Sequence, residues 1–132
     1  MKIVIPGKPI PLKRHRHTRN GFTYNPQSKL MSKLRNIISL QFNREPYNIP
    51  LHVEFIFYMA IPKMSKAKTL QLIGTPHFKK PDISNILKFY EDSFNSFIWK
   101  DDALIYKVTA QKIYDLSPRT EIHIFPFSGL LI

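Results

Sequence analysis

The sequence contains no cysteine, and its 132 residues include only four glycines. The lack of cysteine excludes disulfides, thiolate zinc sites, iron–sulfur clusters and a cysteine nucleophile, so any metal must sit on oxygen or imidazole. No apolar run approaches the ~20 residues that a membrane-spanning helix needs, which excludes an integral membrane protein, and we expect no membrane partner. No signal-peptide pattern is present, and we therefore expect a cytoplasmic protein.

Acidic residues are also scarce, because nine Asp and Glu stand against 20 Lys and Arg, and the formal charge is +11. The first acid is Glu45, and ten basic residues precede it: Lys2, Lys8, Lys13, Arg14, Arg16, Arg19, Lys29, Lys33, Arg35 and Arg44. This imbalance favours nucleic acid as the partner. Contacts to the phosphate backbone are expected above all in residues 13–19, and a passive, solvated basic loop is the alternative.

The few acids are concentrated in one window. Five of the nine lie between residues 82 and 102, namely Asp82, Glu91, Asp92, Asp101 and Asp102. Clustered carboxylates repel one another, and a divalent cation such as Mg²⁺ would relieve that repulsion while bridging them to phosphate oxygens. In the structural alternative, Asp82 acts at a helix start and the Asp101–Asp102 pair lies in a turn before a strand.

The pattern of apolar residues predicts the secondary structure. Runs of β-branched and aromatic residues indicate strands at 2–6, 51–61, 104–114 and 120–125. Apolar residues at helical spacing indicate helices at 26–43, at about 65–74, and from Asp82 or Ser84 to about Phe97. We expect the strand at 51–61 to be central and the last two strands to form an antiparallel hairpin. The chain is thus predicted to be one α+β domain over residues 1–132, with a mixed β-sheet and two main helices packed on it.

Prolines make the segment between the first strand and the first helix a basic loop or arm. Phe22 and Tyr24 lie beside this arm, and two interpretations stay open: they stack on exposed bases or pack into the core. Lys29 and Lys33 extend the cationic surface along the polar face of the first helix. Trp99 is assigned to the core, and the apolar tail SGLLI is suited to docking or a subunit contact.

Several segments combine into a specific pattern: IPGKPIPLKRHRHTRNGFTYNP, VEFIFYM with the proline that follows, HFKKPDISNILKFYEDSFN, and WKDDALI. With them, nearly the whole chain resembles the RusA-type crossover junction endodeoxyribonucleases of bacteria and their phages. This resemblance implies a small homodimeric α+β enzyme that binds four-way (Holliday) DNA junctions and cuts two strands symmetrically. It also implies Mg²⁺ or Mn²⁺ held by aspartates, and no small-molecule cofactor is expected.

The resemblance assigns roles by position. Asp82 and Asp102 match catalytic, metal-binding acids, and Asp101 lies beside them as a further ligand. Lys88 matches the family's functional lysine and would assist at the developing oxyanion. Asn85 and Asp92 match positions that are common in the family. The residues expected to bind DNA are Lys13, Arg14, Arg16, Arg19, Lys29, Lys33, Lys79 and Lys80.

One position departs from the family pattern. Ser84 stands where the second aspartate of the D-x-D motif is expected, and a hydroxyl supplies neither the charge nor the strong ligand of a carboxylate. A second interpretation is therefore a branched-DNA-binding protein with weakened or lost catalysis. A third is a basic structural domain that binds an acidic protein partner.

Overall fold

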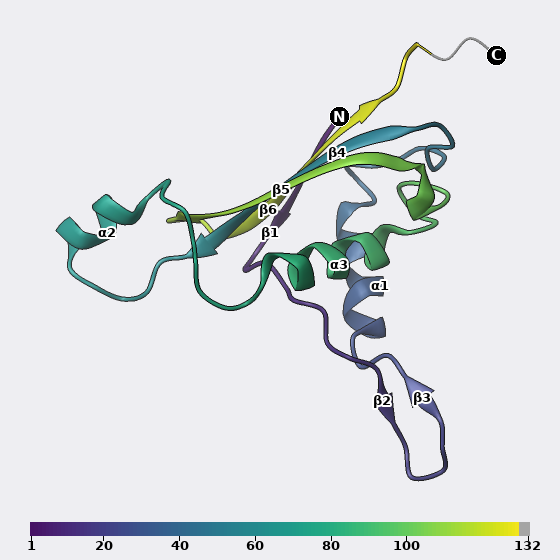
Figure 1. Ribbon diagram of the computed structural model, residues 1–132, viewed down its shortest axis with the longest axis horizontal. Coiled ribbons are helices and arrows are strands. Elements are labelled where there is room, and N and C mark those ends of the chain that lie inside the picture. Colours follow the sequence, from purple (N-terminus) through teal and green to yellow (C-terminus); the bar gives the residue numbers. More distant parts are fainter. Residues whose placement is uncertain (130–132) are drawn as a thin grey trace.

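The computed structural model describes residues 1–129, which form a four-stranded mixed sheet with the two longest helices packed on one face (Figure 1). The strands of this sheet are β1 (Lys2–Pro6), β4 (Leu51–Ala60), β5 (Ile105–Asp115) and β6 (Arg119–Pro126). The helices are α1 (Ser28–Ile38), α2 (Lys66–Leu72), α3 (Ile83–Phe94) and the 3₁₀ helix η1 (Asp102–Leu104). Two short strands, β2 (Arg16–His17) and β3 (Thr23–Tyr24), form a separate hairpin. These elements confirm the α+β prediction.

Two further features concern the length of the helices and the C-terminal tail. Within residues 1–129, no helix is long and apolar enough to cross a membrane. The apolar tail that was assigned to docking ends in residues 130–132, which lie outside the described residues.

Strand β4 is central, as its composition predicts. Its alternate residues, among them Val53, Phe55 and Phe57, are completely or almost completely buried, while the residues between them are half-buried on the opposite face. It pairs with β5 in parallel and with β6 in antiparallel orientation. The buried face packs against α1 and α3, and the strand therefore joins both halves of the sheet to the helices.

The predicted hairpin of the last two strands is wrong, because β4 lies between β5 and β6 in the sheet order β1-β6-β4-β5. The turn that follows β5 reverses the chain, but β5 and β6 do not pair with each other. Arg119 holds this turn, since its Nη1 donates to Asp115 Oδ2 (2.8 Å) and to the Ser117 carbonyl oxygen (2.9 Å). Because β4, the most apolar strand, lies between β5 and β6, the polar groups of its backbone are paired along both edges.

The first helix is shorter than the expected 26–43, because α1 ends at Ile38. Just beyond it, the Ser39 hydroxyl donates to the Asn36 carbonyl oxygen (2.6 Å). Gln41 then pairs with the edge strand β1: its Oε1 accepts from Val4 N (2.9 Å), and its Nε2 donates to Val4 O (2.8 Å). A side-chain amide thus covers an edge that would otherwise offer free backbone groups to another strand.

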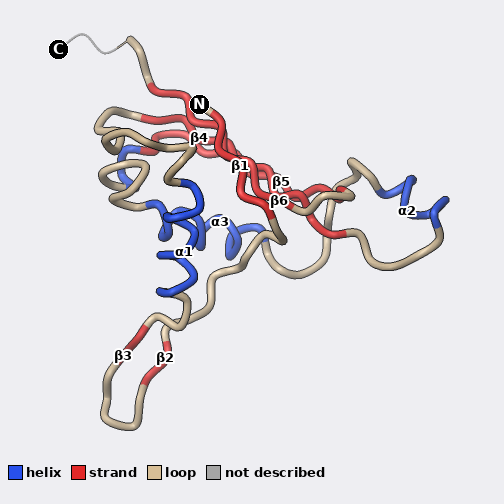
Figure 2. The backbone as a smooth tube through the Cα atoms, turned by 180° about the vertical axis from the view of Figure 1, so that it is seen from behind, coloured by secondary structure: helices blue, strands red, loops and turns tan. Residues whose placement is uncertain are grey.

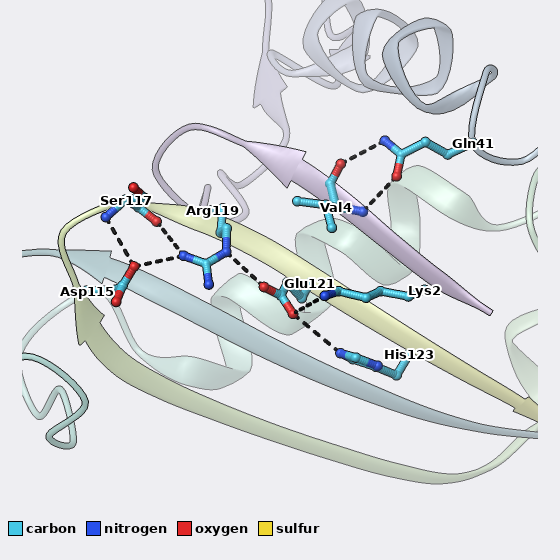
Figure 3. A network of polar contacts seen from close by, with 8 residues as sticks. All are labelled: Lys2, Val4, Gln41, Asp115, Ser117, Arg119, Glu121 and His123. Carbon is cyan, nitrogen blue, oxygen red and sulfur yellow. Dashed lines mark hydrogen bonds and ion pairs between the residues drawn. The ribbon is translucent and has the colours of Figure 1, made fainter.

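The face of the sheet away from the helices carries a polar network (Figure 3). Arg119 Nε donates to Glu121 Oε2 (2.8 Å), and Lys2 Nζ lies 3.3 Å from Glu121 Oε1. The Arg119 guanidinium also stacks over the ring of Tyr58, 3.7 Å from its centroid. These contacts connect β1, β4 and β6 through side chains as well as through backbone pairing.

Helix α3 has the predicted 3.6-residue periodicity and buries Ile86, Phe89, Tyr90 and Phe94. Because Phe89 is fully buried, Phe89→Ala is expected to lower the free energy of unfolding by about 3–5 kcal/mol. Phe22→Ala, at a side chain that is 69% exposed, should change it by less than about 0.5 kcal/mol. Urea denaturation followed by the fluorescence of Trp99 measures both, and equal losses would contradict the assigned core.

Candidate active site

Helix α3 presents a polar stripe to solvent on the side opposite its buried residues. Ser84, Lys88 and Asp92 follow one another at four-residue spacing and therefore share one helix face. Lys88 exposes 65% of its side chain, and its Nζ lies 3.9 Å from Asp92 Oδ1. The carboxyl end of this stripe is thus acidic, with an exposed cationic side chain one turn before it.

Asp102 is fixed beside the end of α3 by two hydrogen bonds. Trp99 is completely buried, and its Nε1 donates to Asp102 Oδ1 over 2.7 Å. The Asp102 backbone N–H donates to the side-chain Oδ1 of Asn95, directly after α3 (3.1 Å). Asp101 accepts from Ala103 N (2.8 Å) and so caps η1. The expected turn position of the Asp101–Asp102 pair is therefore correct, and the same turn carries Asp102 to the helix.

The acids at this end influence one another, and we call Glu91, Asp92, Asp101 and Asp102 the carboxylate cluster. Burial raises the pKa of Asp102, and the charges of Asp92 and Asp101 raise it further. Burial likewise raises the pKa of Glu91, with added contributions from Asp102 and Asp92. Lys88 lowers both values. Ionised carboxylates in this cluster are held close enough to repel one another.

Asp82 lies at the other end of α3. It occupies the N-cap position, but its side chain makes no capping hydrogen bond. Its Oδ1 accepts from Lys80 Nζ instead (2.8 Å), and this bond and the Lys80 charge lower the pKa of Asp82. From Asp82 to Asp92 the helix rises about 15 Å. The length of α3 therefore separates Asp82 from the carboxylate cluster, and the structure does not bring Asp82 and Asp102 together.

Lys112 is a residue at this site that the sequence patterns did not single out. Register with Phe57 places it on the helix-facing side of β5. Its Nζ donates to the carbonyl oxygens of Lys79 and Pro81, both over 2.7 Å. Burial lowers the pKa of Lys112, and the charge of Asp82 opposes that shift. A lysine at an inward-facing strand position was the sequence signal that could have identified this residue. In the folded chain, Lys112 fixes the segment that carries Asp82.

The residues expected to bind DNA are all exposed, and they lie on three elements. Lys29 and Lys33 lie on α1, and Lys79 and Lys80 precede α3. The remaining four, Lys13, Arg14, Arg16 and Arg19, belong to the arm of residues 7–25 that contains the β2–β3 hairpin (Figure 2).

The arm is attached to the body at defined points. Leu12 N donates to the Asn85 carbonyl oxygen of α3 (2.9 Å), which places the arm beside the first turn of that helix. Nearer the hairpin, the buried Gln27 side chain accepts from Lys13 N (2.7 Å) and donates to Pro11 O (2.9 Å). The basic hairpin therefore projects from a fixed base next to the amino end of the polar stripe.

The donors at the carboxylate cluster fit the chemistry of Mg²⁺. Among residues 1–129, no three His, Asp or Glu side chains are gathered in an arrangement that would hold a metal ion by themselves. Mg²⁺ is commonly bound by one or two carboxylates, with waters and substrate phosphates completing its six ligands. Asp102 and its acidic neighbours offer such carboxylates, and a cation would offset the repulsion that raises their pKa values.

Comparison with known proteins gives two findings. The sequence profile of the family described as endodeoxyribonuclease RusA matches residues 6–125. A protein of Bacillus subtilis (strain 168), the uncharacterized protein YqaN, is 27% identical over 135 residues, and the alignment covers 94% of each chain. The matched region contains the arm, α3 and the carboxylate cluster.

The raised pKa of Asp102 predicts an unusual effect of neutralising it. The folded state binds the proton more tightly than the unfolded chain, so ionisation of Asp102 costs stability at neutral pH, and stability is regained as pH falls through the raised pKa. Asp102→Asn keeps an oxygen acceptor for Trp99 and should unfold at pH 7 with a free energy equal to or above that of the wild type.

Asp115→Asn is the matched control with the opposite sign. Hydrogen bonds from Ser117 N and Arg119 lower the pKa of Asp115, so its charge stabilises the fold above the unfolded-state pKa and that stability is lost at lower pH. This variant should be less stable than the wild type at pH 7. Urea titrations at pH 7 and about pH 5 compare the variants. A clear loss of stability in Asp102→Asn at pH 7 would contradict the raised pKa of Asp102.

Proposed function

The chain belongs to the RusA family of endodeoxyribonucleases, and we propose that it is a divalent-metal-dependent nuclease that resolves four-way DNA junctions. The observation that carries this proposal is the polar stripe of α3, on which Lys88 is followed by the carboxylate cluster, while Asp82 and the attachment point of the basic arm lie at the amino end of the helix. Cationic side chains of the arm, of α1 and of residues 79–80 would bring phosphates to the acids. Without these cationic side chains, the negative charge of the carboxylate cluster would repel DNA.

When bound, Mg²⁺ would activate the attacking water and stabilise negative charge on the phosphate. Asp102 would hold the ion, since the Trp99 and Asn95 hydrogen bonds fix its position before substrate arrives. Asp101 is the further ligand that we propose at the cluster, with Asp92 and Glu91 adding negative charge nearby. Asp82 lies about 15 Å from Asp92 along α3, too far to bind the same ion, and we propose it as a metal-binding acid at the amino end of the helix. Lys88 would leave its long contact with Asp92 and donate to a phosphate oxygen in the transition state.

We further propose that the enzyme acts as a homodimer. A two-fold dimer carries two identical sites related by the same operation that relates the strands of a four-way junction. Such a pair of sites would cut strands of like polarity and release two duplexes. One site alone would nick the junction and leave it connected.

The proposal predicts cleavage of a synthetic four-way junction with Mg²⁺ and none in EDTA. Asp82→Asn and Asp102→Asn should each lower the cleavage rate by at least about 100-fold, because an amide is a poor ligand for Mg²⁺. Junction binding without metal should stay equal or become tighter, since a negative charge near phosphate is removed. Glu45→Gln, at an exposed acid outside the polar stripe, is the matched control and should cut normally. Cleavage by Asp102→Asn at the wild-type rate would refute the site.

Ser84 favours the second candidate, a branched-DNA-binding protein with weakened or lost catalysis. It is exposed on the polar stripe, one helical turn before Lys88, at the position where the family motif has an aspartate. If catalysis is limited by the missing carboxylate, Ser84→Asp should raise cleavage at low Mg²⁺, with a smaller gain at saturating Mg²⁺.

Ser32→Asp, at an exposed serine of α1, adds the same charge away from α3 and should leave cleavage unchanged. A wild type that binds junctions without cutting them, together with an active Ser84→Asp variant, would establish the second candidate. Cleavage by Ser84→Asp that is unchanged or lower at every Mg²⁺ concentration would show that the serine is no defect.

A further inference from the structure

The β2–β3 hairpin projects away from the sheet and its helices in both views of the backbone (Figures 1 and 2). The arm that carries it has the densest positive charge of the chain, since four of the seven residues from 13 to 19 are Lys or Arg. Its tip also exposes an aromatic side chain, because Phe22 is 69% exposed. A large apolar ring surrounded by cations is poorly matched to water or to an apolar protein core.

The position of Phe22 is set by a tight turn. The Thr18 carbonyl oxygen accepts from Gly21 N (3.1 Å), and Thr18 N donates to Phe22 O (2.7 Å). The Phe22 N–H donates in turn to the Thr18 hydroxyl (3.1 Å). Gly21 has a φ of +81°, which a side chain would disfavour and which three-residue hairpin loops commonly need. The ring is therefore carried on a defined turn and not on a random loop.

The strand register divides the hairpin into two chemically different faces. Arg16 lies opposite Tyr24, and His17 lies opposite Thr23. Side chains that lie opposite each other share a face, as the 3.0 Å contact between His17 Nδ1 and Thr23 Oγ1 illustrates. Phe22 precedes Tyr24 by two residues and so belongs to the Arg16 face. One face is thus aromatic and guanidinium-bearing, while the other carries imidazole and hydroxyl groups.

Planar rings next to a guanidinium are the side chains on which nucleic-acid bases stack without regard to base identity. In an intact duplex the base faces are covered by neighbouring pairs, whereas the branch point of a junction exposes them. We propose that Arg16, Phe22 and Tyr24 form a stacking face, with which the hairpin inserts Phe22 against the bases exposed at the branch point. The inference rests on the proposed function and adds the element that distinguishes a junction from linear DNA.

Binding of the full-length protein, in EDTA to prevent cleavage, tests this inference. The probes are a synthetic four-way junction with 2-aminopurine at the branch point and a linear duplex of the same sequence. Phe22→Ala should bind the junction about 10-fold more weakly and lose the change in 2-aminopurine fluorescence, while its affinity for the duplex stays the same. Phe22→Trp should restore both signals, because it restores a stacking ring.

Two control variants separate stacking from charge and from general surface changes. Leu40→Ala removes a side chain that is 93% exposed outside the arm and should behave as the wild type. Replacing Lys13, Arg14 and Arg19 together by alanine, which leaves the stacking face intact, should weaken binding to both DNAs and reduce the salt slope by up to about 3. Phe22→Ala should leave that slope unchanged, because a phenyl ring releases no counterions.

The outcomes distinguish this inference from the proposed function. If the wild type prefers the junction and Phe22→Ala retains both the preference and the fluorescence change, the stacking face is wrong and the proposed function stands. If the wild type binds both DNAs equally, the preference for junctions fails and the inference fails with it. A Phe22→Ala variant that changes only the oligomeric state would make the hairpin tip a subunit contact and would also overturn the inference.

Discussion

Strand β4 has to be paired along both edges, because its alternate side chains are buried and water cannot reach its backbone. Strands β5 and β6 supply the two partners, in opposite orientations. The parallel pairing with β5 brings Lys112 into contact with the segment that precedes α3. Because the two strands are parallel, the chain between α3 and β5 has to return to the end of the sheet at which β4 begins. Both ends of the polar stripe on α3 are thus positioned by the same strand.

The chemistry of the stripe is obtained at a cost in stability. Burial raises the pKa of Asp102, which accepts a hydrogen bond from the buried Trp99, and the charges of Asp92 and Asp101 raise it further. A fold selected only for stability would place lysines around such acids, as it does around Asp82. In the proposed function, a cation bound at the cluster would relieve this repulsion, and the cationic arm would offset the charge of the DNA.

The arm combines a firm base with an exposed end. Gln27 uses both ends of its amide to hold residues 11 and 13, and a backbone hydrogen bond ties Leu12 to α3. Between residues 14 and 24 the described hydrogen bonds of the arm are those of the hairpin itself. The base of the arm is thus fixed beside α3, while the side chains of the hairpin remain available to a large polyanion.

Local sequence patterns were enough to predict the strand at 51–61, observed as Leu51–Ala60, together with the apolar face of α3, the burial of Trp99, and the separation of basic and acidic segments. The sequence also supplied the family's motif residues, Ser84 included. The tertiary structure decided what depends on contacts between distant residues. Alternation and turn residues do not specify which strand becomes a neighbour, so β4 between β5 and β6 was not predictable from them. The contacts of Lys112, the ion pair of Lys80 with Asp82, and the hydrogen bonds that fix Asp102 at the end of α3 were not predictable either. Each of them depends on a partner that only the folded chain brings into contact.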